Sequence, residues 1–242
     1  MTSKKMKIEV WSDIMCPYCY IGKIHFEKAL HQFAHVDEVE LEWKAFQLNK
    51  ELPDKGNGYP VKEYLVNSVG YPEEGMESMF AHIRKLADDA GVAFNLPNSV
   101  AANTRDAHRL IKLAATKGLD SVVVGKLGKA YFEEAKDYSD WELLVSIGRE
   151  AGLEEEEIRR MLESDDFKYD IIQDMQEAAN LGFDSVPIFL MDRRQAIIGS
   201  EPVDLFVKVL NKAYNDWKNR TDKEEELEIT QGKSCSTDGT CD

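Results

Sequence analysis

The four cysteines of this chain fall into two close pairs, and the first pair has the spacing of a redox motif. Cys16 and Cys19 enclose Pro-Tyr, whereas Cys235 and Cys241 enclose five residues. A C-x-x-C sequence between a strand and a helix is typical of thiol–disulfide exchange. Unpaired N–H groups at the start of such a helix stabilise an anion, so we expect Cys16 to be an exposed nucleophile with a lowered pKa. Cys19, one turn further along, would face inward and resolve the mixed disulfide.

The same four cysteines offer a second interpretation, in which they bind zinc in an interaction module rather than an enzyme. Five residues between Cys235 and Cys241 are an unusual spacing for half of a zinc site, and Pro-Tyr does not form the turn of a zinc ribbon. The pattern therefore favours redox chemistry, and we expect no metal. Asp13, just before the motif, is either a group that modulates the thiols or a solvated carboxylate of the turn.

The segments around the first pair predict a β-α-β unit. Residues 7–11 have the composition of a short strand, and residues 16–30 place apolar side chains at helical spacing. Apolar and polar residues alternate strictly over 39–45, which indicates a half-buried strand. A crossover helix between two strands of one sheet makes them parallel. The first cysteine pair thus lies where a strand gives way to a helix.

A helical segment follows a Pro- and Gly-rich loop at residues 47–60. Helical periodicity continues for about a hundred residues, including residues 103–117, 153–163 and 167–180. Ser139-x-x-Glu142 has the form of a capping box, opening a helix that ends at Gly152. We therefore expect an all-helical domain of residues 61–181, inserted into an α/β domain of residues 6–60 and 182–218.

Strand character returns at Val186, where a proline interrupts it. Residues 186–190 and 196–198, with a polar turn at 192–194, predict a β-hairpin, and residues 200–202 begin a last amphipathic helix. Pro187 has no N–H to donate to a strand ladder, so it either caps an edge or forms a cis bend beside the active site. Combined with the C-x-x-C motif, the pattern favours the cis bond.

The second cysteine pair lies in a polar, acidic tail of residues 219–242, which we expect to be an exposed, weakly ordered appendage. Asp238-Gly239 is a turn-forming pair that would bring Cys235 and Cys241 together. Two interpretations stay open at this stage. The tail thiols are either exposed and indifferent, or they form a secondary redox pair that closes as a disulfide and exchanges with, or docks near, the first pair.

The order of these motifs resembles the DsbA-like branch of the thioredoxin superfamily over about residues 6–218. Within that branch, the sequences at residues 10–22, 103–110 and 182–187 are most similar to the FrnE-type, protein disulfide isomerase-like members. The resemblance implies an α/β thioredoxin-like fold with a large all-helical insertion. It also implies that Cys16 and Cys19 are the redox pair, that Pro187 is the cis proline, and that Val186 offers backbone groups to a substrate.

Further substrate contacts are expected close to the motif. Pro17 and Tyr18 lie inside it, and Asn103 and His108 join them if they line the cleft between the helical insertion and the cysteines. A position on the helix surface, or a satisfied interior position, is the alternative for His108.

Two related enzyme classes share the inserted helical domain, namely the glutathione-dependent 2-hydroxychromene-2-carboxylate isomerases and the kappa-class glutathione transferases. Those enzymes carry Ser at the first motif position, whereas this chain has Cys16 and keeps Cys19. The resemblance therefore favours a thiol–disulfide oxidoreductase over an isomerase or transferase. Its partners would be protein or small-molecule thiols and disulfides, with glutathione, as a co-substrate, or a thioredoxin system as candidate reductants. The direction of exchange depends on the reduction potential and stays open.

Charge and composition exclude several other classes. The chain has 30 Lys+Arg against 45 Asp+Glu, a net charge of −15, and this argues against nucleic-acid binding, which needs a basic face. No apolar run approaches the roughly 18 to 20 residues that cross a bilayer, and the first residues do not form the apolar segment of a signal peptide. We therefore expect a globular, cytoplasmic protein with no membrane partner.

Overall fold

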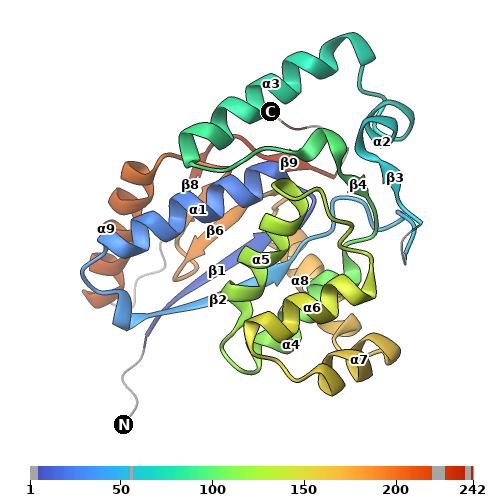
Figure 1. The fold of residues 1–242 in the computed structure, drawn as a ribbon. Helices are drawn as coiled ribbons and strands as arrows, with labels where there is room; N and C mark the ends of the chain where they lie inside the picture. Colours follow the sequence, from blue (N-terminus) through green and yellow to red (C-terminus); the bar gives the residue numbers. More distant parts are fainter. Residues whose placement is uncertain (1–4, 55–56, 220–226, 238–240, 242) are drawn as a thin grey trace.

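A five-stranded sheet, in the order β2-β1-β6-β7-β8, lies at the centre of the part of the chain that the structure describes (Figure 1). The computed structural model describes residues 5–54, 57–219, 227–237 and 241. β1 is parallel to β2, β6 is antiparallel to β1 and β7, and β8 is parallel to β7. The strands are β1 (Met6–Ser12), β2 (Val39–Ala45), β3 (Tyr59–Pro60), β4 (Val100–Ala101), β5 (Ser185–Val186), β6 (Ile188–Met191), β7 (Gln195–Ile198), β8 (Glu228–Gln231) and β9 (Cys235–Ser236).

Helices cover the sheet and fill the stretch of chain between β2 and β5. They are α1 (Pro17–Gln32), α2 (Val61–Asn67), α3 (Glu73–Ala90), α4 (Arg105–Ala115), α5 (Asp120–Phe132), α6 (Trp141–Ala151), α7 (Glu155–Glu163), α8 (Lys168–Asn180) and α9 (Val203–Lys218), with 3-10 turns at Val36–Glu38 and Leu96–Asn98. The parallel β1-α1-β2 unit, the helical segment, the β6-β7 hairpin and the last helix were all predicted from the sequence. None of the described helices is both long enough and apolar enough to cross a membrane.

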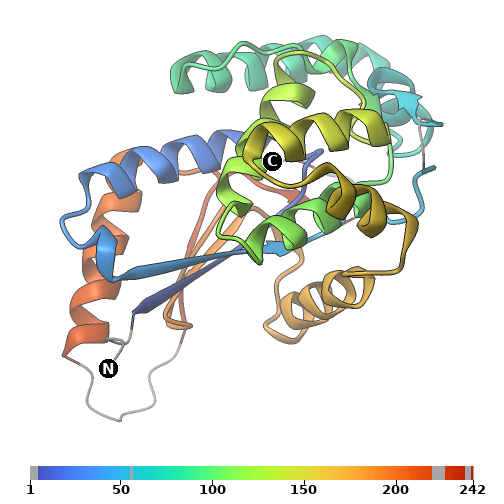
Figure 2. The ribbon, with the colours of Figure 1, turned by 60° about the horizontal axis from the view of Figure 1, so that its bottom comes forward.

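The central strand β6 is apolar at every position because both faces of the sheet are buried. On one face, Phe189 packs against Phe26 of α1 and Phe206 of α9, with ring centroids 4.9 and 4.8 Å away. On the other face, the indole N–H of Trp11 donates to the backbone oxygen of Asp174 in α8 at 2.9 Å. The sheet therefore lies between an α1/α9 layer and α8, and the helices of the insertion extend to one side (Figure 2).

Some helices of the predicted insertion pack against one another, and others pack against α1 or the central sheet. α4 packs against α5, α6 and α7, whereas α3 lies along α1 (Figure 1). α8, although the sequence analysis assigns it to residues 61–181, packs against β2 and covers the second face of the sheet. Both α4 and α8 contact β2, so the insertion is joined to the sheet at the strand next to β1.

The predicted capping box at Ser139 is wrong by one residue. α6 begins at Trp141, and the side chain of Asp140 caps it by accepting from the backbone N–H of Glu142 at 2.9 Å. Ser139 donates its hydroxyl to Asp137 instead. Asp competes well with Ser for the cap position, so two adjacent candidates cannot be ranked from sequence. The predicted stop at Gly152 is correct, because this residue ends α6 with a φ of 104°.

The expectation that the C-terminal tail is a weakly ordered appendage is also wrong for its described residues. β8 adds to the edge of the central sheet by pairing with β7, and β9 pairs with β5. An edge strand carries unpaired N–H and C=O groups, which a following segment can satisfy even when its composition is polar. The predicted turn at residues 238–239 lies outside the described residues, and so do residues 220–226.

Candidate active site

The first cysteine pair opens α1 directly after the loop that follows β1. Cys16 is the N-cap of α1, with Pro17 as the first helical residue. The backbone N–H of Cys16 donates to the carbonyl of Asp13 at 3.2 Å, and the Cys16 carbonyl accepts from the Cys19 N–H at 3.1 Å. These contacts place the two thiols on the first turn of the helix, as the sequence predicts, and both are free.

Cys16 is not the exposed thiol that the sequence analysis expects, because its exposed fraction is 0%. Burial raises the pKa of Cys16 well above its ordinary value, and the side-chain hydrogen bond and charge interaction with Cys19 act in the same direction. The helix N-terminus favours a thiolate, but desolvation outweighs that effect while the sulfur is covered. Cys19 faces inward, as expected, and is 3% exposed.

The bond between Val186 and Pro187 is cis, the isomer that the sequence analysis favours. The thiol of Cys16 donates to the carbonyl of Val186 at 3.7 Å. Gly22 allows α1 to approach this bend, since a Cβ at that position would lie only 3.2 Å from Cγ of Pro187. Residues separated by most of the sequence thus meet at the Cys16 sulfur.

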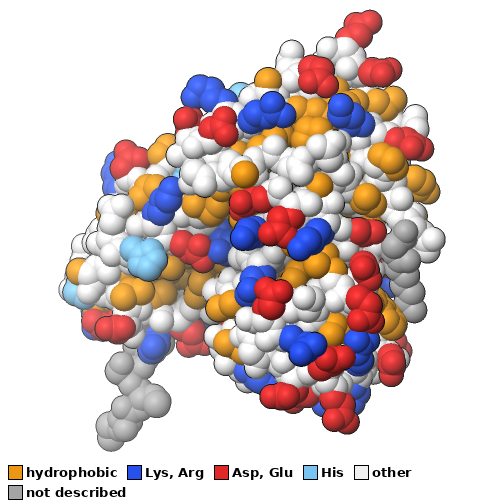
Figure 3. All heavy atoms as spheres, in the orientation of Figure 1, with side chains coloured by type: hydrophobic (Ala, Val, Ile, Leu, Met, Phe, Trp, Pro, Cys, Tyr) orange, Lys and Arg blue, Asp and Glu red, His pale blue; other side chains and the backbone are white. Residues whose placement is uncertain are grey.

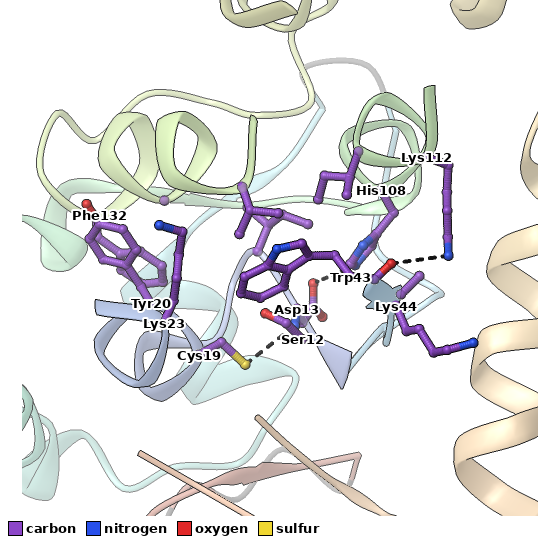
Figure 4. Close-up of a pocket in the computed structure, with 15 residues that line it drawn as sticks. Ser12, Asp13, Cys19, Tyr20, Lys23, Trp43, Lys44, His108, Lys112 and Phe132 are labelled. Atoms are coloured by element: carbon purple, nitrogen blue, oxygen red, sulfur yellow. Dashed lines mark hydrogen bonds and ion pairs between the residues drawn. The ribbon is translucent and has the colours of Figure 1, made fainter. Parts of the chain in front are cut away.

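A small cavity lies on the other side of the pair, between Cys19 and the helical insertion (Figure 4). The Cys19 sulfur accepts from the backbone N–H of Asp13 at 3.5 Å. One carboxylate oxygen of Asp13 accepts from the Leu48 N–H at 2.7 Å, and the other lies 3.4 Å from Nε2 of His108. The cavity measures about 30 Å³, which suits water rather than a substrate.

Asp13 and His108 are both almost fully buried, at 1% and 4% exposure. Among the described residues, Asp13 Oδ1 and His108 Nε2 have no hydrogen-bond partner. Unsatisfied buried polar atoms are costly, and one proton between these two atoms would satisfy both. The sequence left both residues with two interpretations, and the structure places them together beside Cys19.

The lysines around this cavity are already paired. Lys23 donates to Glu27 at 2.7 Å, and Lys44 donates to Glu177 at 2.8 Å. Lys112 lies 2.5 Å from a carboxylate oxygen of Asp174. The cavity therefore offers no free cluster of positive charge to an anionic ligand.

The other predicted contacts are divided between the active site and the scaffold. Pro17 and Tyr18 are buried on the first turn of α1. Asn103 uses its amide to hold the loop after β2, donating to the carbonyls of Lys50 and Leu52 at 2.8 and 3.0 Å and accepting from Gln47. The structure thus gives Asn103 a scaffold position, and its contact with substrate stays a prediction.

The second cysteine pair is a disulfide, which was one of the two interpretations left open. Cys235 and Cys241 are bonded at an S–S distance of 2.05 Å. Cys235 is 1% exposed and packs in the same buried cluster as Cys16. The disulfide removes two thiolates from the set that the zinc alternative needs, and no other group of metal-ligating side chains gathers in the described residues.

Similarity to known proteins agrees with this geometry. Residues 7–211 match the model of the DSBA-like thioredoxin domain. A solved protein described as a probable DsbA oxidoreductase, from Streptomyces coelicolor, is 32% identical with a TM-score of 0.81, covering 98% of each chain.

Two further solved structures share the fold at lower identity. A 2-hydroxychromene-2-carboxylate isomerase is 11% identical with a TM-score of 0.68, covering 90% of this chain and 100% of its own. The cytosolic disulfide reductase DsbM from Pseudomonas aeruginosa, solved with GSH, is 15% identical with a TM-score of 0.61, covering 86% of this chain and 99% of its own. These two likenesses establish the architecture and no particular activity.

Proposed function

Because the chain belongs to the family of DSBA-like thioredoxin domains, we propose that it is a thiol–disulfide oxidoreductase with Cys16 and Cys19 as its redox pair. One observation carries the proposal. Cys16 is the N-cap of α1, and Cys19 lies one turn further along the helix. The Cys16 sulfur is 3.7 Å from the carbonyl oxygen of Val186, the residue before the cis proline. Membership of the FrnE-type branch remains a prediction.

The exchange proceeds in two balanced steps. The Cys16 thiolate attacks one sulfur of a substrate disulfide, forming a mixed disulfide and releasing one substrate thiolate. The Cys19 thiolate then attacks the Cys16 sulfur, which forms the Cys16–Cys19 disulfide and releases the second substrate thiol. Two electrons pass to the substrate, and the reverse sequence oxidises a substrate dithiol.

The environment suits each cysteine to its step. Cys16 faces Val186, whose backbone can pair with an extended substrate. Cys19 lines the cavity together with Asp13 and His108, and that cavity has room for a water molecule that can carry the thiol proton to the Asp13 carboxylate when resolution begins. Glutathione or a thioredoxin-type protein would complete the cycle as reductant, consistent with the thiol chemistry.

The Cys235–Cys241 disulfide is the proposed secondary redox pair. In an exchange between the pairs, the Cys16 thiolate attacks the tail disulfide at Cys235 and releases the Cys241 thiolate. Cys19 then displaces Cys235, leaving Cys16–Cys19 oxidised and the tail reduced. Both pairs pack in one buried cluster through Cys16 and Cys235, and this supports the proposal.

Insulin-disulfide reduction with glutathione as the electron donor tests the activity directly. We expect turnover by the native chain and none by Cys16→Ser. Full turnover by Cys16→Ser would overturn the proposal and favour isomerase chemistry, in which a hydroxyl serves at this position. For the secondary pair, Cys19→Ser/Cys241→Ser should form a Cys16–Cys235 disulfide on oxidation, seen by peptide mapping. Absence of that species would return the tail disulfide to a structural role.

A further inference from the structure

β9 occupies the backbone edge next to the active-site cysteine. In the described part of the chain, β5 and β9 form a two-stranded sheet by themselves. Val186 pairs with Cys235 and Ser185 pairs with Ser236, in antiparallel register. Val186 is also the residue whose carbonyl faces the Cys16 thiol at 3.7 Å. Strand pairing and the reactive sulfur therefore meet at the same peptide unit.

The position of the tail agrees with the burial of the nucleophile. Cys16 and Cys235 belong to one buried cluster, with exposed fractions of 0% and 1%. A disulfide substrate must bring its sulfur into line with the Cys16 sulfur, which a fully covered thiol does not allow. The arrangement shown is thus a closed one, in which some neighbour of Cys16 has to move before reaction.

An apolar cavity of about 60 Å³ adjoins β9, since Cys235 and Ser236 are among the residues that line it. Apolar side chains that include Met15, Pro17, Leu65, Val69 and Met79 line it, and the tail contributes Cys235, Ser236 and Cys241 to the same lining. Departure of the tail would therefore open the cavity. Among the residues that the structure describes, no Lys, Arg or His side chain lines it, so the carboxylates of glutathione would find no opposite charge there.

From these observations we propose that the edge of β5 and the adjoining apolar cavity form the docking site for an extended polypeptide substrate, which β9 occupies as a built-in competitor. The inference rests on the proposed function and adds the substrate class and its control. An incoming polypeptide replaces the backbone pairing of β9 and places an apolar side chain, next to its disulfide cysteine, in the opened cavity. Cys16 becomes accessible in the same movement.

Backbone contacts anchor the tail up to Lys233, so only the residues after it need to detach from β5. The backbone N–H of Ser200 donates to the carbonyl of Lys233 at 2.9 Å. Gly199 and Gly232 pack backbone to backbone, since a Cβ at Gly199 would lie 2.4 Å from the carbonyl carbon of Gly232. β8 and residues up to Lys233 can remain in place while β9, which pairs with β5 at two positions, detaches.

Two variants separate occupation of the edge from exchange of the tail disulfide. Deletion of residues 234–242 removes β9 but keeps β8 and every strand of the five-stranded sheet. Cys235→Ser/Cys241→Ser keeps the strand and also lacks the tail disulfide. Each is compared with the native chain, using short peptides that carry one cysteine as a mixed disulfide with a coloured aromatic thiol, flanked by Leu or by Glu.

We expect the deletion variant to react with the Leu-flanked peptide at least about tenfold faster than the double-Ser variant. In the double-Ser variant β9 still covers Cys16, so the rate is limited by the fraction of molecules in which β9 has detached. With the Glu-flanked peptide, the increase in rate from the double-Ser variant to the deletion variant should be smaller. Equal rates for the two variants, or equal gains for the two peptides, would overturn the docking site. If no variant reacts with either peptide while thermal melting shows a folded protein, the proposed function itself fails, which is a distinguishable result.

A second measurement uses the full chain and does not depend on the deletion. The Leu-flanked peptide with Ser in place of its cysteine cannot react but can still occupy the edge. Its binding should raise amide hydrogen exchange in residues 234–237 and leave β8 protected. Binding with unchanged exchange in residues 234–237 would show that β9 stays in place, and the proposal would be wrong.

Discussion

The two cysteine pairs of this protein meet at Val186, yet they are held in different ways. Cys16 and Cys19 are free thiols on the first turn of a long helix, buried under neighbouring segments. Cys235, in the two-residue strand β9, forms a disulfide with Cys241 six residues further along the chain, and Cys241 is exposed. Spacing alone marks the first pair as reactive, but its cover decides whether the Cys16 sulfur can be reached. The comparison teaches that access, as well as thiol chemistry, has to be measured.

The largest effects on activity are expected when either thiol of the first pair is replaced. Cys16→Ser should lower insulin reduction by at least about a thousandfold, since it removes the nucleophile. Cys19→Ser should instead accumulate a mixed disulfide with substrate, visible on a non-reducing gel, because the resolving thiol is absent. The reverse pattern, with trapping by Cys16→Ser, would exchange the roles of the two cysteines.

Replacement of Asp13, the buried carboxylate in the cavity beside Cys19, should slow one step of the exchange, the resolution of the mixed disulfide. Asp13→Asn retains an oxygen that can accept from the Leu48 N–H, so the fold should survive. Loss of a proton acceptor should slow resolution of the mixed disulfide by about a hundredfold, whereas formation of the mixed disulfide changes little. Rapid-quench kinetics over a range of pH separates the two steps. An equal decrease in both steps, with an unchanged pH profile, would assign Asp13 to structure alone.

Burial of Cys16 predicts a pH dependence that the tail pair cannot show. Its raised pKa means that alkylation of the native chain should accelerate about tenfold per pH unit through neutral and mildly alkaline pH, as the thiolate fraction rises. A plateau near neutral pH would contradict the raised pKa. Measurement by mass spectrometry also reports any labelling of Cys19.

The same shift links pH to stability. The folded state holds the Cys16 proton more tightly than the unfolded state, whose thiol titrates near about 8.5. The contribution of Cys16 is therefore fully present below that value and is lost as the pH rises toward the higher folded pKa, so the free energy of unfolding should fall. Cys16→Ala, compared by denaturant melts, should lose this part of the alkaline decrease. Identical curves would refute the linkage.

The smallest effect is expected at the anchor of the tail. Lys212 of α9 lies 2.7 Å from a carboxylate oxygen of Glu228 in β8, with both side chains largely exposed. Glu228→Gln should leave the midpoint of thermal unfolding almost unchanged, because exposed ion pairs contribute little to stability. A large decrease in that midpoint would show that this pair, rather than strand pairing, holds β8 on the sheet.

Local patterns predicted most of the elements around the first pair. Strict alternation at residues 39–45 marked β2 with its observed bounds, and the helical spacing after Cys16 marked α1. The cis bond before Pro187 was expected only in combination with the C-x-x-C motif. Capping at Asp140 rather than Ser139 shows the limit, because both residue types satisfy a helix start.

The C-terminal tail was misjudged because its structure depends on partners far away in the sequence. Polar composition favours disorder when a segment is considered alone. β8 is nevertheless ordered by the open edge of β7, and β9 by the edge of β5. Neither edge can be recognised before the sheet order is known.

By itself, the sequence determined that this protein has a redox-type cysteine pair at the start of a helix, a late Val-Pro strand and a long helical insertion. Those features follow from short-range periodicity and residue chemistry, which are readable in order along the chain. Only the tertiary structure decided that Cys16 is covered, that Asp13 meets His108, and that Cys235 pairs with Val186. Each of these depends on segments that are far apart in sequence, and burial and strand pairing are set by what the folded chain brings together.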